Sequence, residues 1–131
     1  MTEFDPNIPI YLQIMHSIRR AIVTGEITRG DKLPSVREKA EDLKVNPNTV
    51  QRAYQELERE GTCETRRGTG TFVVESENLV ADLRATMANE VVDACITGLS
   101  ALGFDDGEIL DAIQTRQKKF IQGDNGHARH S

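Results

Sequence analysis

The sequence lacks the features that mark secreted, disulfide-bonded or membrane proteins. Its two cysteines, Cys63 and Cys95, lie far apart without a C-x-x-C pair, so no disulfide framework is indicated. No apolar run approaches the roughly 20 residues that a membrane-spanning helix needs. The acidic N-terminus MTEFDPNIPIY does not have the pattern of a signal peptide. We therefore expect a cytoplasmic protein with no membrane partner.

An excess of positive charge is also lacking, since the net charge is −5. Residues 1–75 carry 11 basic and 12 acidic side chains, whereas residues 76–131 carry 5 and 9, so the acidic excess lies in the second half. A nearly neutral first half can still present one basic face. The charge distribution therefore permits a nucleic-acid partner without indicating one.

The chain has no recognisable catalytic or metal-binding arrangement. His16, His127 and His130 lack paired ligand spacing, and no Ser/His/Asp, Cys/His or paired-carboxylate set stands out. The segment RRGTGT contains G-x-G, but the later glycine and the Lys–Ser/Thr pair of a phosphate-binding loop are missing. We expect no enzymatic activity, no metal site and no cofactor.

Two helices are predicted before residue 45. Pro9 is expected to occupy the first position of one helix, and Gly25 to end it. Ser35 and Glu38 have the spacing of a capping box, which predicts a second helix up to about Leu43. The apolar stripe of the first helix consists of Tyr11, Ile14, Ile18 and Ile22.

A third helix and a β-hairpin follow in the stretch VNPNTVQRAYQELEREGTCETRRGTGTFVV. Asn46 is a good N-cap, Pro47 suits the first helical position, and Gly61 ends the helix. The segments 62–66 and 71–74 favour strands, with 67–70 as the turn between them. The core stripe of the third helix is predicted to consist of Val50, Ala53, Tyr54 and Leu57.

From about residue 78 the pattern is helical again. One long helix is expected to loosen at Gly98 and Gly103, and Asp105 with Glu108 opens a helix that reaches about Ile121. These two amphipathic helices are too small to form a core alone, so they need the first block or another subunit as a partner. We predict a mainly α fold with a small β-hairpin, divided into residues 1–76, residues 77–122 and a polar, disordered tail at 123–131.

The very short turn between the second and third helices is typical of a helix-turn-helix motif, and the hairpin makes it a winged variant. The exposed face of the third helix would carry amide, hydroxyl and guanidinium groups that can reach base edges in a major groove. Arg37 begins the second helix, and a basic hairpin tip suits a phosphate or a minor groove. The predicted DNA-binding residues are therefore Arg37, Asn48, Thr49, Gln51, Arg52, Arg66, Arg67, Gly68 and Thr69.

The segment GDKLPSVREKAEDLKVNPNTVQRAYQELEREG, followed by ETRRGTGTFV, resembles the N-terminal domain of the GntR family of bacterial transcription regulators. The resemblance covers residues 9–75, and the short two-helix remainder resembles the YtrA-type subfamily. It implies a homodimer on a palindromic operator of double-stranded DNA, and a repressor of transporter or envelope-stress genes. Family contacts map to Arg37, Asn48, Thr49, Gln51 and Gly68. Dimer contacts are expected from Leu83, Met87, Val91, Ile109, Ile113 and Phe120.

The sequence departs from the family pattern at two positions near the third helix. Many relatives have an arginine that reads guanine where Pro47 stands, so the operator is expected to differ from theirs. A glycine is common where Lys44 stands, and a lysine in a left-handed conformation costs roughly 1 kcal/mol.

Two other functions stay open at this point. One is a winged-helix module that binds protein without DNA, and the net acidity is compatible with it. The other is a ligand-gated switch, in which a small molecule or metal enters between the C-terminal helices and the first block. The sequence does not identify such an effector.

Overall fold

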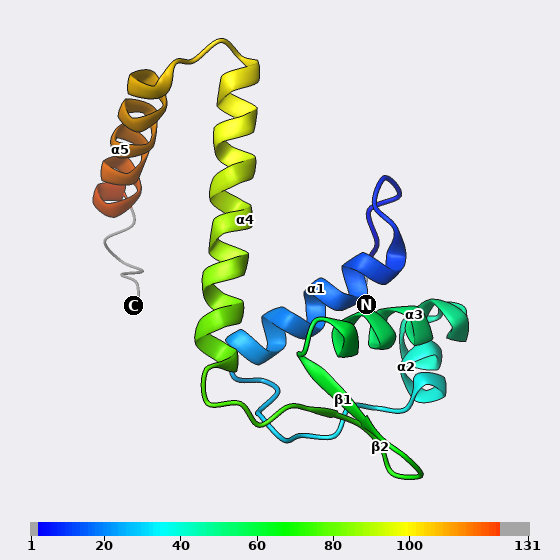
Figure 1. Cartoon of the computed structure of the whole chain (residues 1–131). Coiled ribbons are helices and arrows are strands. Elements are labelled where there is room, and N and C mark those ends of the chain that lie inside the picture. The colour runs from blue at the N-terminus through cyan, green and yellow to red at the C-terminus, as the bar shows by residue number, and fades with distance from the viewer. Residues whose placement is uncertain (1–2, 124–131) are drawn as a thin grey trace. The chain divides into compact units, whose positions relative to one another are not determined.

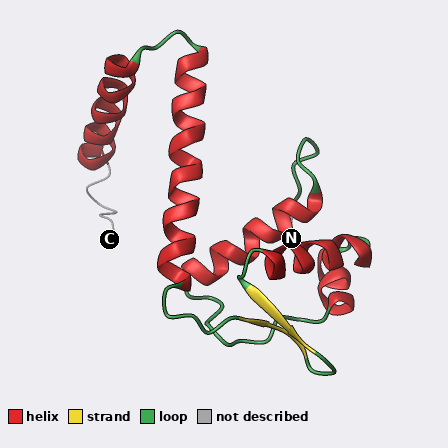
Figure 2. Cartoon of the chain, in the orientation of Figure 1, coloured by secondary structure: helices red, strands yellow, loops and turns green. Residues whose placement is uncertain are grey.

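The computed structural model describes residues 3–123 and is mainly helical with one two-stranded hairpin, as the sequence predicted (Figure 1). Figure 2 shows that helices dominate both halves of the chain and that the strands occur together in the first half. The elements are α1 (Ile10–Val23), α2 (Val36–Leu43), α3 (Pro47–Arg59), β1 (Cys63–Arg66), β2 (Gly70–Val73), α4 (Leu79–Ala101) and α5 (Asp106–Gly123).

The chain forms two compact units, and the division falls inside α4. The first unit ends at Ala85 and the second begins at Thr86. The first turns of α4 belong to the first unit because Leu79 and Leu83 lie in its hydrophobic core. The two units are described separately below.

Local hydrogen bonds set the start of α2. The Ser35 hydroxyl accepts from the Glu38 N–H (3.0 Å), and the Ser35 N–H donates to the Glu38 carboxylate (2.9 Å), which completes the predicted capping box. These bonds from Ser35 hold the pKa of Glu38 below its ordinary value.

The turn between α2 and α3 has the predicted geometry. Lys44 ends α2 with φ 58°, in the left-handed region. The Asn46 side chain accepts from the Asn48 N–H (2.7 Å), and Pro47 takes the first position of α3. The proline therefore begins the recognition helix without breaking it.

The core of the first unit forms where α1, α2 and α3 pack together with the hairpin. Val50, Leu57 and Val73 are completely buried. The predicted stripe of α1 packs inward: Ile14, Ile18 and Ile22 are buried, and Tyr11 is half-buried and packs against the core, which Met15 joins as well. The remaining core side chains are Leu33, Ala40, Ala53, Tyr54, Cys63, Leu79 and Leu83.

The acidic end of α3 fastens this helix to its neighbours. Arg19 of α1 donates to Glu60 (Nε–Oε2 3.0 Å), and the Thr62 hydroxyl donates to the same carboxylate (2.7 Å). Partial burial opposes ionisation of Glu60, but these hydrogen bonds outweigh it and lower its pKa. The Thr65 hydroxyl donates to Glu58 (3.2 Å), which links α3 to β1.

The connector before α2 runs along the hairpin. Strands β1 and β2 are antiparallel, with Cys63 opposite Val73 and Arg66 opposite Gly70. Lys32 forms an isolated antiparallel bridge with Phe72, and the Leu33 N–H donates to the Thr71 carbonyl (2.8 Å). This added rung fixes the hairpin against the body of the unit.

Three further expectations differ from the structure or fall outside it. Pro9 is the N-cap of α1, one residue before the predicted position. Gly98 does not loosen α4, which continues to Ala101, because an isolated glycine costs a long helix only about 1 kcal/mol. In the predicted tail, residues 124–131, with His127 and His130, lie outside the described residues.

The second unit contains the rest of α4, followed by α5. Asp105 and Glu108 form the predicted capping box, with both hydrogen bonds at 2.9 Å. Among the described residues from 86 to 123, Ile109 is the one buried hydrophobic side chain. Most of the other apolar side chains are exposed in the single chain, among them Val91, Val92, Ile96, Leu102, Leu110, Ile113, Phe120 and Ile121.

Candidate nucleic-acid interface

The polar face of α3 lies opposite its buried stripe. Asn48 and Gln51 are exposed in the first two turns, and Thr49 is half-buried. Each of these side chains can donate or accept a hydrogen bond at a base edge. The structure therefore places the predicted polar cluster on an accessible surface, at the N-terminal end of the helix.

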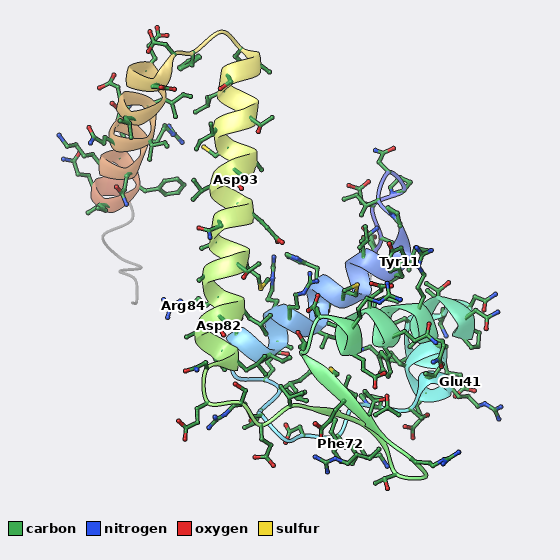
Figure 3. All side chains as sticks on the ribbon, in the orientation of Figure 1. Tyr11, Glu41, Phe72, Asp82, Arg84 and Asp93 are labelled. Carbon is green, nitrogen blue, oxygen red and sulfur yellow. The ribbon has the colours of Figure 1, made fainter. Side chains whose placement is uncertain are left out.

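Arg52 lies on the same side of α3 but is in contact with α1. Its guanidinium carbon lies 3.9 Å from the centre of the Tyr11 ring, and its Nη2 donates to the Tyr11 hydroxyl (3.3 Å). Figure 3 shows Tyr11 at the start of α1, close to α3. The Tyr11 ring and hydroxyl thus hold the Arg52 guanidinium in place on this surface.

A shallow hollow of about 410 Å³ joins the starts of α1 and α3. Ile10 and Tyr11 come from α1, and Arg52 comes from α3. Sequence reasoning missed the contribution of α1, because it assigned Tyr11 to the core. The remaining lining residues are Asn46, Asn48 and Thr49.

The two arginines of the hairpin tip differ in their surroundings. Arg66 Nε donates to the Glu64 carboxylate (3.0 Å), and its guanidinium lies 4.0 Å from the centre of the Phe72 ring. Figure 3 marks Phe72 on the hairpin. Arg67 is exposed, and no carboxylate of residues 3–123 forms an ion pair with it. Arg67 is therefore the more accessible cation of the tip.

Glycines let the hairpin turn close to the connector. Gly68 has φ 74°, and the Thr69 N–H donates to the Arg66 carbonyl (2.9 Å), which closes the turn. A Cβ atom on Gly70 would lie 2.7 Å from Cε of Lys32, so a side chain there would displace Lys32. The tip thus presents Arg67 and Thr69 on a tightly packed turn.

Arg37 is exposed in the first turn of α2. A partly buried hydrogen bond lies next to this turn, since the Tyr54 hydroxyl of α3 donates to the Pro34 carbonyl (2.8 Å). Burial of Tyr54 raises the pKa of its hydroxyl well above the ordinary value, so it stays protonated and able to donate. The bond ties the backbone just before α2 to α3.

Neither cysteine contributes a reactive centre to this surface. Cys63 is buried, and burial, with smaller effects from Glu60 and Glu58, raises the pKa of its thiol to about 12. Within residues 3–123 there is no cluster of three or more His, Cys, Asp or Glu side chains able to hold a metal ion. The helices in this range include none long and apolar enough to cross a membrane.

A recognition helix with an exposed polar face, a supporting helix and a basic wing together define a winged helix-turn-helix DNA-binding protein. Residues 10–73 match the family described as bacterial regulatory proteins, gntR family. The chain belongs to the GntR family. It is 46% identical over 113 residues to the HTH-type transcriptional regulator YhcF of Bacillus subtilis, covering 86% of this chain and 93% of that protein.

A second relative and two solved structures agree with this placement. The chain is 42% identical to the HTH-type transcriptional repressor YtrA of Bacillus subtilis, over 76% of this chain and 82% of that protein. A GntR family transcriptional regulator from Listeria monocytogenes matches with a TM-score of 0.75 and 42% identity, over 86% and 98% of the two chains. The DNA-binding domain of AraR in complex with operator ORR3 matches with a TM-score of 0.50 and 30% identity, over 56% and 87%.

These findings make the chain a DNA-binding transcription regulator of the GntR family. They favour DNA binding over the alternative of a winged-helix module that binds only protein. The relatives are transcription regulators, a class of proteins that are not enzymes.

Proposed function

We propose that the protein binds a palindromic operator as a homodimer and represses transcription. The observation that carries this proposal is the exposed polar face of α3, opposite a completely buried apolar stripe. Each subunit places the first two turns of α3 in a major groove. The two half-sites lie about one helical turn apart.

Base recognition falls to a small set of side chains in those turns. Asn48 and Gln51 have the amide geometry that pairs with adenine, and Arg52 can read guanine. Pro47 carries no group that can read a base edge. The operator is therefore expected to differ from those of relatives with an arginine at this position.

Phosphate contacts supply much of the affinity and little of the specificity. Arg37 and Arg67 are exposed beside the two ends of the proposed contact surface, and neither forms an ion pair with a described residue. Arg66 adds a cation that Glu64 partly neutralises.

The second unit supports the proposed dimer through its exposed apolar side chains. Val91 is 68% exposed and Phe120 is 66% exposed in the single chain. Several large apolar side chains that are exposed on two neighbouring segments of one chain are typical of a subunit interface. Of the residues expected at the interface, Met87, Ile113 and Ile109 also belong to this unit, whereas Leu83 packs in the core of the first unit.

Repression is supported by the similarity to YtrA, which is described as a repressor. We propose transporter or envelope-stress genes as its targets. A deletion strain would show higher transcription from the promoters that carry the selected operator, and lower transcription in the deletion strain would contradict repression.

Selection of bound duplexes from a random pool would identify the operator. Gln51→Ala is then expected to lose affinity for the operator but not for a scrambled duplex, whereas Arg67→Ala weakens both. Arg67→Ala is also expected to reduce the slope of log K against log salt by about 1 per subunit, and so by about 2 for the proposed dimer. Equal losses on both duplexes for Gln51→Ala would contradict base reading by this residue.

Sedimentation analysis tests the dimer independently of DNA. Phe120→Asp and Ile113→Asp place a charge on the proposed interface and are expected to give monomers, whereas Lys118→Asp is the matched control on α5. A monomeric wild-type protein at micromolar concentration would contradict the dimer.

A further inference from the structure

A second hollow lies in the first unit and shares no lining residue with the hollow beside α3. It has a volume of about 740 Å³, within the range of about 300–1,000 Å³ that small-molecule sites occupy. We call it the N-terminal groove. The residues that matter for its chemistry are Phe4, Ile8, Leu12, Arg20, Lys39 and Leu43.

One wall of the groove is the segment before α1, which hydrogen bonds from Gln13 hold in place. The Gln13 side chain accepts from the Asp5 N–H (2.9 Å) and donates to the carbonyls of Asp5 and Ile8 (2.8 Å each). Phe4 packs against the hydrophobic core. The segment is thus preformed, as a ligand site requires.

The groove contains unusual apolar exposure for this unit. Within residues 3–85, the exposed large hydrophobic side chains are Ile8, Ile10 and Leu12. Ile8 and Leu12 both line the groove, with exposed fractions of 44% and 40%. The apolar surface that the first unit leaves uncovered is therefore concentrated there.

Cations border this apolar surface. The Arg20 guanidinium lies 3.2 Å from the His16 ring nitrogen Nε2, and neither Arg20 nor Lys39 has a carboxylate within ion-pair distance among residues 3–123. Glu3 is the single acidic side chain among the described lining residues, and Arg19 is bonded to Glu60. The net charge of the groove is positive.

We propose that the N-terminal groove binds a small amphipathic anion, a molecule with an apolar body and one carboxylate or phosphate. The apolar body contacts Phe4, Ile8 and Leu12, and the anionic group binds Arg20 and Lys39. Lys39 and Leu43 belong to α2, which carries Arg37 in its first turn. A ligand bound in the groove therefore acts on the same helix that presents Arg37 for DNA contact.

Calorimetric titration of the full chain with decanoate, and with decanol as the neutral counterpart, tests the site directly. Decanoate is expected to bind saturably, one per chain, and decanol to bind at least about tenfold more weakly, because it cannot form charge-assisted bonds with Arg20 and Lys39. Lys39→Met and Arg20→Met are each expected to lower the affinity for decanoate about tenfold. Lys118→Met, an exposed cation on α5, is the control and should leave it unchanged.

Equal affinity for decanoate and decanol would overturn the proposal, and so would unchanged binding in both Lys39→Met and Arg20→Met. Binding that persists in these variants but disappears in Phe120→Asp would assign decanoate to the C-terminal helices. Arg20 is exposed, so its variant carries the test alone if Lys39→Met does not fold.

The link to DNA rests on the proposed function and needs its own measurement. Saturating decanoate is expected to change the affinity of the wild-type protein for its selected duplex at least about fivefold, and Lys39→Met is expected to need about tenfold more decanoate for the same change. An unchanged duplex affinity with decanoate bound would overturn this link. Absence of duplex binding without decanoate would instead be a failure of the proposed function.

Discussion

Removing the Tyr11 ring is the sharpest test of how α1 supports DNA recognition. The ring lies 3.9 Å from the Arg52 guanidinium, and its hydroxyl accepts a hydrogen bond from Arg52 at 3.3 Å. Tyr11 is half-buried, so Tyr11→Leu removes both contacts while keeping an apolar side chain. Tyr11→Phe keeps the ring and removes only the hydrogen bond.

The expected loss of binding free energy follows from the conformational freedom that Arg52 loses when it stacks on the Tyr11 ring. A free arginine loses on the order of 0.5–1.5 kcal/mol when an interface immobilises it. In this structure Tyr11 has already ordered Arg52, and a partly exposed cation–π contact of about 0.5–1 kcal/mol is of the right size to do so. Tyr11→Leu is therefore expected to cost about 1 kcal/mol per subunit, which is about 2 kcal/mol, or roughly thirtyfold in Kd, for the proposed dimer on its operator.

A double-mutant cycle measures whether this loss passes through Arg52. Kd values on the selected operator are compared for the wild type, Tyr11→Leu, Arg52→Ala and the double variant. We expect Tyr11→Leu to have little further effect once Arg52 is alanine, and Tyr11→Phe to stay within about twofold of the wild type. Additive losses would refute the positioning role, and tighter binding by Tyr11→Leu would show that the stack withholds Arg52 from DNA.

Three further predictions concern stability and reactivity. Lys44→Gly relieves the left-handed backbone and is expected to raise the free energy of unfolding by up to about 1 kcal/mol in urea, whereas Lys44→Ala should not. The pKa of Glu60 is lower in the folded protein than its value of about 4.3 in the unfolded chain, so the ionised carboxylate stabilises the fold above that pH. The free energy of unfolding of the wild type should therefore exceed that of Glu60→Gln by less as the pH falls below about 4.3. The same excess in the free energy of unfolding at pH 7 and pH 3 would exclude this linkage. In a Cys95→Ser background, Cys63 is expected to react with a thiol reagent at pH 8 only as fast as the protein unfolds, and rapid labelling of the native state would contradict its burial.

The recognition helix could be predicted from the sequence because its signals are local. Asn46 and Pro47 mark its start within two residues, and the apolar stripe repeats within the helix itself. The exposed positions of Asn48 and Gln51 follow from that stripe by helical geometry alone. Capping residues and periodicity were therefore sufficient to locate the predicted base-reading face.

The contacts that modify this face could not be predicted in the same way. Tyr11 and Arg52 are 41 positions apart, and the periodicity of α1 counted Tyr11 as a core residue. The bridge between Lys32 and Phe72 likewise joins two segments that are distant in the sequence, since Lys32 precedes α2 and Phe72 lies in β2, after α3. Such pairs depend on how the helices pack, which no local pattern records.

The distribution of charge supports the proposal that two subunits act together on DNA. Of the phosphate contacts proposed for one subunit, Arg37 and Arg67 supply exposed cations, and Arg66 is partly neutralised by Glu64, so these residues account for two or three phosphates. The first 75 residues have 12 acidic against 11 basic side chains, so long-range attraction to DNA is weak. Two linked copies double the phosphate contacts and make the second docking step intramolecular, which raises affinity without a new contact. The exposed apolar side chains of the second unit are the ones that we propose to provide that link.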